Sequence, residues 1–488
     1  MRLPAPGSPL RRPLMVAAVV ALLVLPAPVA TPLVGAMLAV AAVAAVAAVA
    51  AVRAGRTLAG RVRPGTLRED QIILGVDTGG RLVRLGYDEL SAHGLIVGAS
   101  GAGKTTTLLT ILSDQIRRGR PVVAIDMKGS PAFVRELAAA ATAAGRPINV
   151  WTIDGGAYWN PIAHGNATEL KDKLIRTERF TEPHYMKAAE RYVQTVLQLL
   201  TAAHPGRPPT LHEVVELMDP ARLTGVLRHV DRPLRERVQD YRAGLTHDQL
   251  SAVRGLQTRL AILTESHTGP FLAPPGDPQA DTIDLRRALS GSEVVVFSLN
   301  SSRYGQLAGQ IGTWAVQDLV AVSGVRLEQA SGGRALAPAI IAIDEFSGIG
   351  TDHVGALLVR GREAGMPVFV STQELVDFER ASAGFRDLVL GVTAVNIFHR
   401  QNVPESARTI ARIAGTEMVW EETRQTGGGL LGGYETGRGS RRRVERFIVD
   451  PNEIQTLPRG QAVVISKIRG GRPRTVRVAP PRRDGPER

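Results

Sequence analysis

The stretch Gly98-Ala-Ser-Gly-Ala-Gly-Lys-Thr105 decides the fold, because it matches the pattern GxxxxGK[ST]. The apolar run Gly94–Val97 leads into it, and a helical pattern continues from Thr105. A strand, a glycine-rich loop and a helix in this order form a phosphate-binding loop, whose backbone N–H groups surround phosphate oxygens at the helix N-terminus. A chance match of a glycine-rich loop is the alternative, and the flanking strand and helix argue against it. The sequence therefore predicts a nucleotide site.

Two side chains of this loop have chemistry of their own. Lys104 places a positive charge toward the β- and γ-phosphates of ATP, and the Thr105 hydroxyl is a ligand for Mg²⁺. The residues that we expect to contact the nucleotide are Gly98, Ser100, Gly101, Gly103, Lys104, Thr105 and Thr106.

A second apolar run, Ala339–Ile343, ends in the adjacent carboxylates Asp344 and Glu345. At the carboxyl edge of a parallel sheet these acids lie beside the phosphate-binding loop. We expect Asp344 to hold Mg²⁺ through water and Glu345 to act as general base toward the attacking water. The alternative is that the two acids only cap the next helix. The loop upstream favours the catalytic interpretation.

Three further polar residues are candidates for the same chemistry. Gln373 follows the strand-like run Val368–Ser371 and is a candidate sensor of the γ-phosphate, although polar residues after strands are common. Arg362 follows the helical pattern after Glu345, and Arg400 follows the last strand-like run of the sheet. Each arginine is either a solvated surface residue or a finger supplied to the ATP of a neighbouring subunit.

Short apolar runs alternate with helical patterns along most of the chain, which predicts an α/β fold with a parallel sheet, a RecA-like nucleotide-binding domain. Between residues 163 and 290 the strand-like runs disappear, so an all-α domain is expected to be inserted there. The Pro/Arg-rich end is predicted to be disordered. The expected parts are a transmembrane hairpin with basic flanks (1–63), the ATPase domain (64–162 and 291–470), the inserted domain (163–290) and a basic tail (471–488).

The amino-terminal part predicts a membrane anchor. No charged residue occurs from Pro13 to Val52. Leu33–Val52 has the length of about 20 apolar residues that a spanning helix needs, and Leu14–Ala30 is a shorter candidate. Basic residues on both outer sides place both ends in the cytoplasm. A cleaved secretory signal is the alternative, but it sends the ATP-binding body into a compartment without ATP. We therefore expect a multi-pass protein of the inner (cytoplasmic) membrane, in contact with the lipid bilayer.

The 488-residue chain contains 59 Lys+Arg and 46 Asp+Glu, a net charge of +13. Residues 1–63 carry +7 and residues 437–488 carry +9, whereas residues 64–436 carry −3. The excess charge is thus evidence for topology more than for a nucleic-acid cargo. The absence of cysteine excludes disulfides, thiolate metal sites and a cysteine nucleophile.

Taken together, these features resemble the type IV secretion coupling proteins, the conjugative DNA-transfer ATPases of the FtsK/HerA superfamily. Short motifs add to the resemblance, in the family's order along the chain. They are Ile125-Asp-Met-Lys-Gly129, Asn160-Pro161, Gly361-Arg-Glu-Ala-Gly-Met366, Ser371-Thr-Gln373 and Pro404-Glu-Ser-Ala-Arg-Thr-Ile-Ala411 with Gly415-Thr416. Met127 departs from the family's usual proline, and a basic tail stands where some members have an acidic one.

The resemblance implies a ring, expected to be a homo-hexamer, with ATP at subunit interfaces and Arg362 as the finger acting in trans. It also implies single-stranded DNA bound to a relaxase as the cargo, and components of a type IV secretion channel as partners.

The residues themselves give less support for DNA. Aromatic residues make up only 4% of the chain, so a base-stacking platform is poorly supplied, and contact would be made through phosphates. Two other functions stay open. One is a related motor that moves chromosomal DNA or protein, and the other is a non-motor membrane receptor switched by nucleotide.

Overall fold

The computed structural model describes residues 71–176, 180, 182–333, 336–429 and 432–481. All of these residues belong to one compact unit, Asp70–Arg488. Its strands are β1 (Gln71–Asp77), β2 (Leu82–Gly86), β3 (His93–Val97), β4 (Val122–Asp126), β5 (Ile148–Thr152), β6 (Gly155–Gly156), β7 (Tyr158–Trp159), β8 (Thr282–Ile283), β9 (Val294–Ser298), β10 (Ile340–Asp344), β11 (Val368–Thr372), β12 (Thr393–His399), β13 (Thr416–Gly429), β14 (Gly432–Phe447), β15 (Gln461–Ser466) and β16 (Arg474–Val478).

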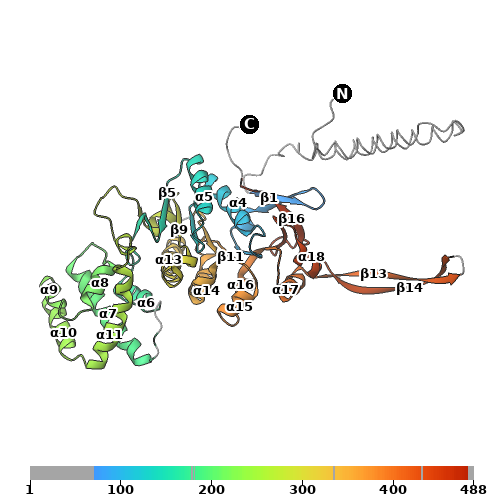
Figure 1. The fold of residues 1–488 in the computed structure, drawn as a ribbon. Coiled ribbons are helices and arrows are strands. Elements are labelled where there is room, and N and C mark those ends of the chain that lie inside the picture. Colours follow the sequence, from blue (N-terminus) through green and yellow to red (C-terminus); the bar gives the residue numbers. More distant parts are fainter. Residues whose placement is uncertain (1–70, 177–179, 181, 334–335, 430–431, 482–488) are drawn as a thin grey trace. The chain divides into compact units, whose positions relative to one another are not determined.

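Helices connect these strands (Figure 1). They are α3 (Tyr87–Leu90), α4 (Lys104–Arg117), α5 (Pro131–Ala143), α6 (Ala167–Arg176), α7 (Pro183–Ala203), α8 (Leu211–Leu217), α9 (Leu223–Val226), α10 (Arg232–Ala243), α11 (His247–Thr264), α12 (Leu285–Ser290), α13 (Ser301–Ser331), α14 (Thr351–Gly361), α15 (Val376–Ala381), α16 (Phe385–Val392), α17 (Pro404–Ala414) and α18 (Pro451–Thr456), with short 3-10 turns at Leu227–His229, Gly269–Leu272 and Phe346–Gly348.

Among the described residues, twelve strands form one mixed sheet in the order β2-β1-β16-β15-β12-β3-β11-β10-β4-β9-β5-β6. Every neighbouring pair from β12 to β5 is parallel. The strands on either side of this parallel part are antiparallel to their neighbours. The expected α/β fold with a parallel sheet is therefore present, extended by antiparallel strands at its edges.

The central strands are apolar throughout because both faces of the sheet are covered. In β4, Val123 and Ile125 contribute to one core, and Val122 and Ala124 contribute to the other. Helices α4 and α5 cover the second face, whereas α13 and α14 cover the first (Figure 1). A continuous apolar run thus forms a strand with a hydrophobic core on each side.

Between β7 and β8 the described residues form the helices α6 to α11. Their starts are marked by local capping: Thr210 and Glu213 form a capping box at α8, Thr246 and Gln249 form one at α11, and Asp231 caps α10. These helices lie within the range 163–290 predicted from the sequence. That this range is a separate domain stays a prediction.

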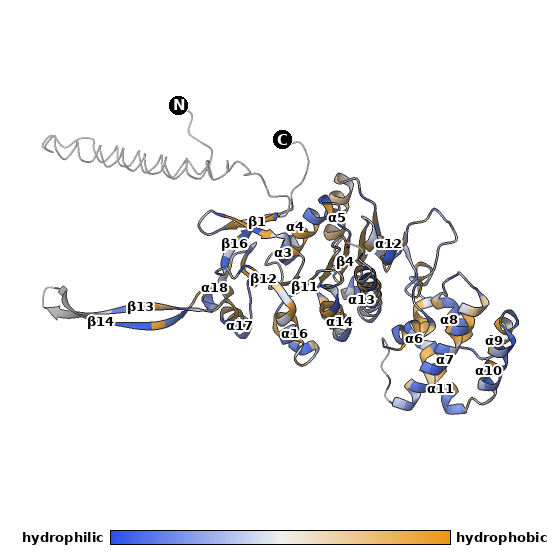
Figure 2. Cartoon of the chain, turned by 180° about the vertical axis from the view of Figure 1, so that it is seen from behind, coloured by the Kyte–Doolittle hydropathy of each residue, from blue (hydrophilic) through white to orange (hydrophobic). Residues whose placement is uncertain are grey.

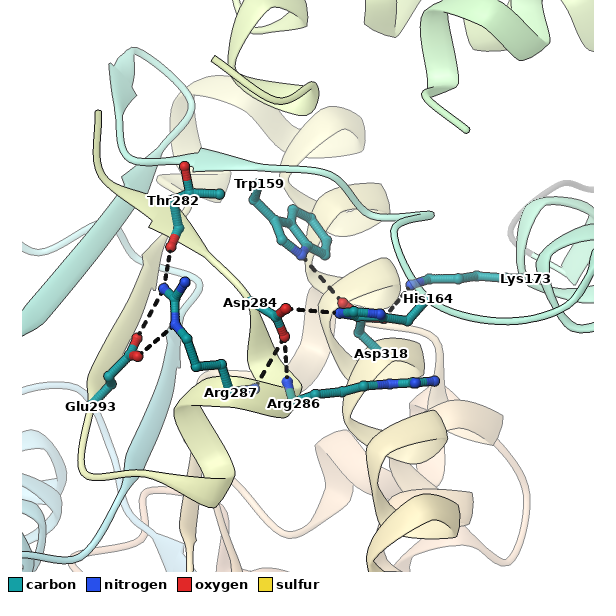
Figure 3. A network of polar contacts seen from close by, with 9 residues as sticks. All are labelled: Trp159, His164, Lys173, Thr282, Asp284, Arg286, Arg287, Glu293 and Asp318. Atoms are coloured by element: carbon teal, nitrogen blue, oxygen red, sulfur yellow. Dashed lines mark hydrogen bonds and ion pairs between the residues drawn. The ribbon is translucent and has the colours of Figure 1, made fainter. Parts of the chain in front are cut away.

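A buried ion pair joins α6 to the long helix α13 (Figure 3). Lys173 Nζ donates to Asp318 Oδ1 at 2.7 Å and also to the Pro161 carbonyl. Trp159 Nε1 donates to the other oxygen of Asp318 at 3.2 Å. Since both charged side chains are less than 10% exposed, their hydrogen bonds replace the water that each charge has lost.

A second group of contacts holds the start of α12 beside this pair (Figure 3). Asp284 Oδ1 accepts the N–H groups of Arg286 and Arg287, and Oδ2 lies 3.0 Å from His164 Nε2. These contacts, the His164 hydrogen bond first, lower the pKa of Asp284 to about 2. The side chain of Arg287 in turn donates to Glu293 and to the Thr282 carbonyl.

The strands β13 and β14 form a two-stranded sheet of their own. Cross-strand partners carry opposite charges, as in Glu421 and Arg442 at 3.0 Å, and Figure 2 colours most of β14 hydrophilic. Met418 and Trp420 are nevertheless 55% and 62% exposed. The Arg443 guanidinium lies 5.7 Å from the Trp420 ring centre, so charge and aromatic surface are adjacent on this hairpin.

The prediction that the tail is disordered from residue 471 is wrong in part. Residues 474–478 form β16, which pairs with β15 on one side and β1 on the other. Val476 and Val478 are buried, whereas Arg477 between them is exposed. This alternation is the pattern of a half-buried strand, which a count of charges and prolines does not show. Residues 482–488 lie outside the described residues.

The predicted membrane hairpin, residues 1–63, also lies outside the described residues. In the ranges that the structure describes, no helix combines the length and the apolar composition needed to cross a bilayer. This finding contradicts the expected multi-pass location in the inner membrane. The predicted contact with the bilayer belongs to residues 1–63 and so lies outside the described residues as well.

Candidate nucleotide-binding site

The phosphate-binding loop leaves β3 in the middle of the sheet and enters α4 at Lys104. Gly101 and Gly103 have φ values of 73° and 124°, which favour glycine. Gly98 is needed for a different reason, because a Cβ there would lie 2.4 Å from the Cβ of His399. The glycines of the motif thus set both the curvature of the loop and its close packing against β12.

Lys104 is buried, with 4% of its surface exposed. Its Nζ donates to the carbonyl oxygens of Gly98 and Ala99, within its own loop. Burial lowers the pKa of Lys104, and nearby Lys128 adds to this, while Glu345 and Asp344 oppose it. The ammonium group therefore lies at the loop, in a setting of mixed charge.

Asp344 ends β10 and is 1% exposed. Its Oδ2 accepts the Thr105 hydroxyl at 3.3 Å, and its Oδ1 accepts the Ser371 hydroxyl. An Mg²⁺ ion bound by the Thr105 hydroxyl would have Asp344 beside it, and because Mg²⁺ keeps several of its waters, the position of this carboxylate fits a hold through water. The structure thus brings together the two residues expected to bind the metal.

Glu345 has a left-handed backbone, with φ 62° and ψ 68°. Its Oε2 accepts the amide of Gln373 at 3.1 Å and lies 3.3 Å from Lys128 Nζ. The carboxylate is therefore held between an amide and a cation, beside Asp344. Strained backbone of this kind is concentrated at functional sites.

Of the other residues expected at the site, some lie beside the loop and one lies at the opposite edge of the sheet. Ser100 and Thr106 are exposed, in the loop and in the first turn of α4. Arg400 follows β12 at the carboxyl edge, where its carbonyl accepts the Ala99 N–H at 2.8 Å, and its Nε is buried without a hydrogen-bond partner among the described residues. Arg362 is exposed at the end of α14, which leads back to the start of β11, so it lies at the opposite edge from the loop of its own chain.

Sequence reasoning missed three residues of this edge. Lys128 belongs to the motif Ile125–Gly129, but nothing in that pattern indicates contact with Glu345. Asp126, at the end of β4, is fully buried, and burial raises its pKa to about 6. His399, at the end of β12, contacts the helix after the loop. A polar residue closing an apolar strand is the signal that Asp126 and His399 share, whereas Lys128 lies two residues past the end of β4.

A parallel sheet with this loop after one strand and a carboxylate after another defines the P-loop ATPase fold. Two family models match the chain: "TraM recognition site of TraD and TraG" over residues 338–459, and "Helicase HerA-like C-terminal" over residues 72–147. No curated protein matches the chain in sequence.

Solved structures show the same fold. The bacterial conjugative coupling protein TrwBdeltaN70, in its unbound monoclinic form, has a TM-score of 0.59 and 15% identity, covering 89% of this chain and 93% of that one. The complex of the plasmid coupling protein TrwB with the non-hydrolysable GTP analogue GDPNP has a TM-score of 0.58 and 15% identity, with coverage of 85% and 92%.

VirB4 of Thermoanaerobacter pseudethanolicus has a TM-score of 0.54 and 13% identity, covering 84% of this chain and 96% of that one. A further TrwB structure, with a TM-score of 0.57 and 16% identity over 85% and 92% of the chains, is a complex with ADP and Mg²⁺. Together with the family models, these matches confirm the predicted resemblance to type IV coupling proteins of the P-loop motor superfamily.

Proposed function

We propose that this chain binds ATP with Mg²⁺ at the carboxyl edge of its sheet and hydrolyses it. The observation that carries the proposal is the convergence of Thr105 and Asp344, 3.3 Å apart, beside a Glu345 carboxylate held by Gln373. These groups come from the ends of two strands, β10 and β11, and from the helix that follows the loop, and a capping role for the two acids does not require that arrangement. TrwB complexes with nucleotide analogues, and with ADP and Mg²⁺, support it.

In this proposal, the loop N–H groups and Lys104 bind the phosphates. Thr105, and Asp344 through water, would hold Mg²⁺, which offsets negative charge on the phosphate oxygens. Glu345 accepts a proton from water as the water oxygen bonds to the γ-phosphorus and the bond to the β,γ-bridging oxygen breaks. The products are ADP and inorganic phosphate. Gln373 donates to Glu345 and so orients the base.

The test is ATP hydrolysis by the full-length protein. We expect Lys104→Ala to abolish nucleotide binding, and Glu345→Gln to lower kcat at least about 100-fold while binding is retained. Matched controls are Lys187→Ala and Glu216→Gln, on exposed parts of α7 and α8. Hydrolysis that survives both site variants would overturn the proposal.

For the cargo, we propose single-stranded DNA delivered with a relaxase to a type IV secretion channel, by subunits assembled as a hexamer. The match to the TraM recognition site of TraD and TraG and the fold of TrwB support this assignment. Single-stranded DNA should raise the ATPase rate several-fold, and a rate unchanged by it would contradict the proposal.

A second candidate is a motor on duplex DNA, favoured by the HerA-like match over residues 72–147. Stimulation by blunt duplex DNA and not by single strands would support it over the first. The two substrates can be compared at equal nucleotide concentration and at one stated ionic strength, because phosphate contacts depend strongly on salt.

A further inference from the structure

His399 is fully buried at the end of β12, which lies between β3 and β15 in the sheet. Its Nδ1 is 2.8 Å from the carbonyl oxygen of Gln461, and its Nε2 is 2.9 Å from the hydroxyl of Thr107 on α4. A carbonyl oxygen only accepts, so Nδ1 carries the proton. The Nε2 atom of the neutral ring then accepts the Thr107 hydroxyl. One imidazole therefore connects β15 to the helix that follows the phosphate-binding loop.

The same side chain packs against the loop itself. A Cβ on Gly98 would meet the Cβ of His399 at 2.4 Å, and a Cβ on Gly103 would meet its Cε1 at 3.2 Å. Gly460, next to Gln461, also contacts the loop, since its N–H donates to the Ala102 carbonyl at 2.8 Å. The glycines at both ends of the loop thus lie against His399.

We propose that His399 is a positioning residue for the phosphate-binding loop. Held by Gln461, it fixes the first turn of α4 through Thr107, and with it the N–H groups and Lys104 that face the phosphates. The inference rests on the proposed function, because it needs nucleotide phosphate to bind at this loop.

Three variants separate the two hydrogen bonds of the ring. His399→Asn keeps a donor near Nδ1 and loses the acceptor for Thr107, whereas His399→Gln keeps an acceptor near Nε2. Thr107→Val removes the hydroxyl and keeps the shape of the side chain. The measurement is the Kd for Mg-ADP by calorimetry on the full-length protein at pH 7.5, with the urea midpoint of each variant.

We expect His399→Asn and Thr107→Val each to weaken Mg-ADP binding about tenfold, the effect of one buried hydrogen bond. The double variant should bind no more weakly than either single one, because both remove the same bond. His399→Gln should stay within about threefold of wild type. In ATP hydrolysis, KM should rise in the Asn variant while kcat at saturation changes less than about twofold.

His93 is the matched control, because it is a second buried histidine, at the start of the neighbouring strand β3. Its Nδ1 accepts the Val368 N–H at 2.9 Å, at the edge of the sheet away from the loop. His93→Asn should leave the Kd unchanged whatever it does to the urea midpoint. Equal weakening in His93→Asn, or additive losses in the double variant, would overturn the positioning role.

Wild type that binds Mg-ADP, beside a His399→Asn variant that binds it equally well, would overturn this inference and leave the proposed function intact. Wild type that binds no Mg-ADP would overturn both.

Discussion

Glu345 combines a reactive position with a backbone conformation that side chains disfavour. Asn300, after β9, is the other non-glycine residue with positive φ among those the structure describes, and asparagine tolerates that region well. Glutamate does not, so its carboxylate is retained there at a cost in folding free energy. A role as general base, beside Asp344 and Gln373, would account for that cost.

The cost of this conformation can be measured. Glu345→Gly and Glu345→Ala both remove the carboxylate, but only glycine relieves the strain at φ 62°. We expect the glycine variant to have a free energy of unfolding about 1 kcal/mol higher than the alanine variant. Urea denaturation of the two proteins gives the difference, and equal midpoints would show that the backbone is unstrained here.

The two buried histidines make stability depend on pH. Burial lowers the pKa of His93 and of His399 to about 4, from 6.5. Because each histidine has a lower pKa in the folded state than in the unfolded state, acid favours unfolding. The free energy of unfolding therefore keeps its full value above pH 6.5 and decreases as pH falls toward 4. The loss is about 2 kcal/mol per histidine at pH 5.

Asp126 has the opposite effect on stability, since its pKa is raised from 3.8 to about 6, which penalises the folded state increasingly as pH rises through this range and fully above about pH 6. The informative quantity is therefore a difference between proteins. Between pH 7.5 and pH 5, wild type should lose more unfolding free energy than the double variant His93→Gln/His399→Gln. Parallel curves for the two proteins would contradict the assignment.

At the scale of elements, helix α6 is joined to α13 by the buried pair Lys173 and Asp318. Among the described residues, Lys173→Ala leaves the Asp318 side chain with only the Trp159 N–H, so we expect a loss of about 3–5 kcal/mol in unfolding free energy. The exposed pair Arg232–Glu236 on α10 is the control, because Arg232→Ala should cost less than about 1 kcal/mol.

If the charge left behind is the cause, the double variant Lys173→Met/Asp318→Leu should recover most of the stability. A double variant as unstable as Lys173→Ala would show instead that the shape of this junction matters, and not its charge.

Strand β16 makes the chain's last described segment part of the sheet. A protein that ends at residue 473 lacks β16, which leaves the facing edges of β1 and β15 unpaired. It also loses the Ala479 carbonyl that accepts the Thr110 hydroxyl of α4. We expect this protein to fail to fold, whereas one that ends at residue 481 should keep the wild-type thermal midpoint. A folded 1–473 protein would contradict the role of β16.

At the scale of the whole molecule, Arg362 is placed where it cannot serve the ATP of its own chain. The parallel strands between its edge and the loop are about 16 Å long. A role as finger therefore requires a second subunit, as the proposed hexamer provides. Arg400, beside the loop, is the alternative that acts within the chain.

ATPase rate as a function of protein concentration tests the shared site. The rate per subunit should rise steeply with concentration, and Arg362→Ala should lower it about 1,000-fold with ATP binding retained. Arg360→Ala, an exposed neighbour on α14, is the control. If Arg362→Ala is active and Arg400→Ala is not, the finger is Arg400.

The phosphate-binding loop, the acids after β10 and the parallel sheet could be predicted because each is written in adjacent residues. Glycines at fixed spacing, an apolar run and its polar end are local patterns. The tail shows the limit of such reasoning. Its arginines and prolines indicated disorder. The segment nevertheless forms a strand, because it pairs with β1 and β15 and buries two valines that lie two residues apart.

The sequence by itself therefore determined which loop has the pattern of a phosphate-binding loop, which acids follow which strand, and that the centre of the sheet is parallel. Only the tertiary structure decided that Lys128 meets Glu345, that His399 meets Thr107, and that Arg362 lies at the far edge of the sheet. The physical reason is that these contacts depend on the order of strands across the sheet. That order is set by the packing of both cores together, and no short stretch of sequence records it.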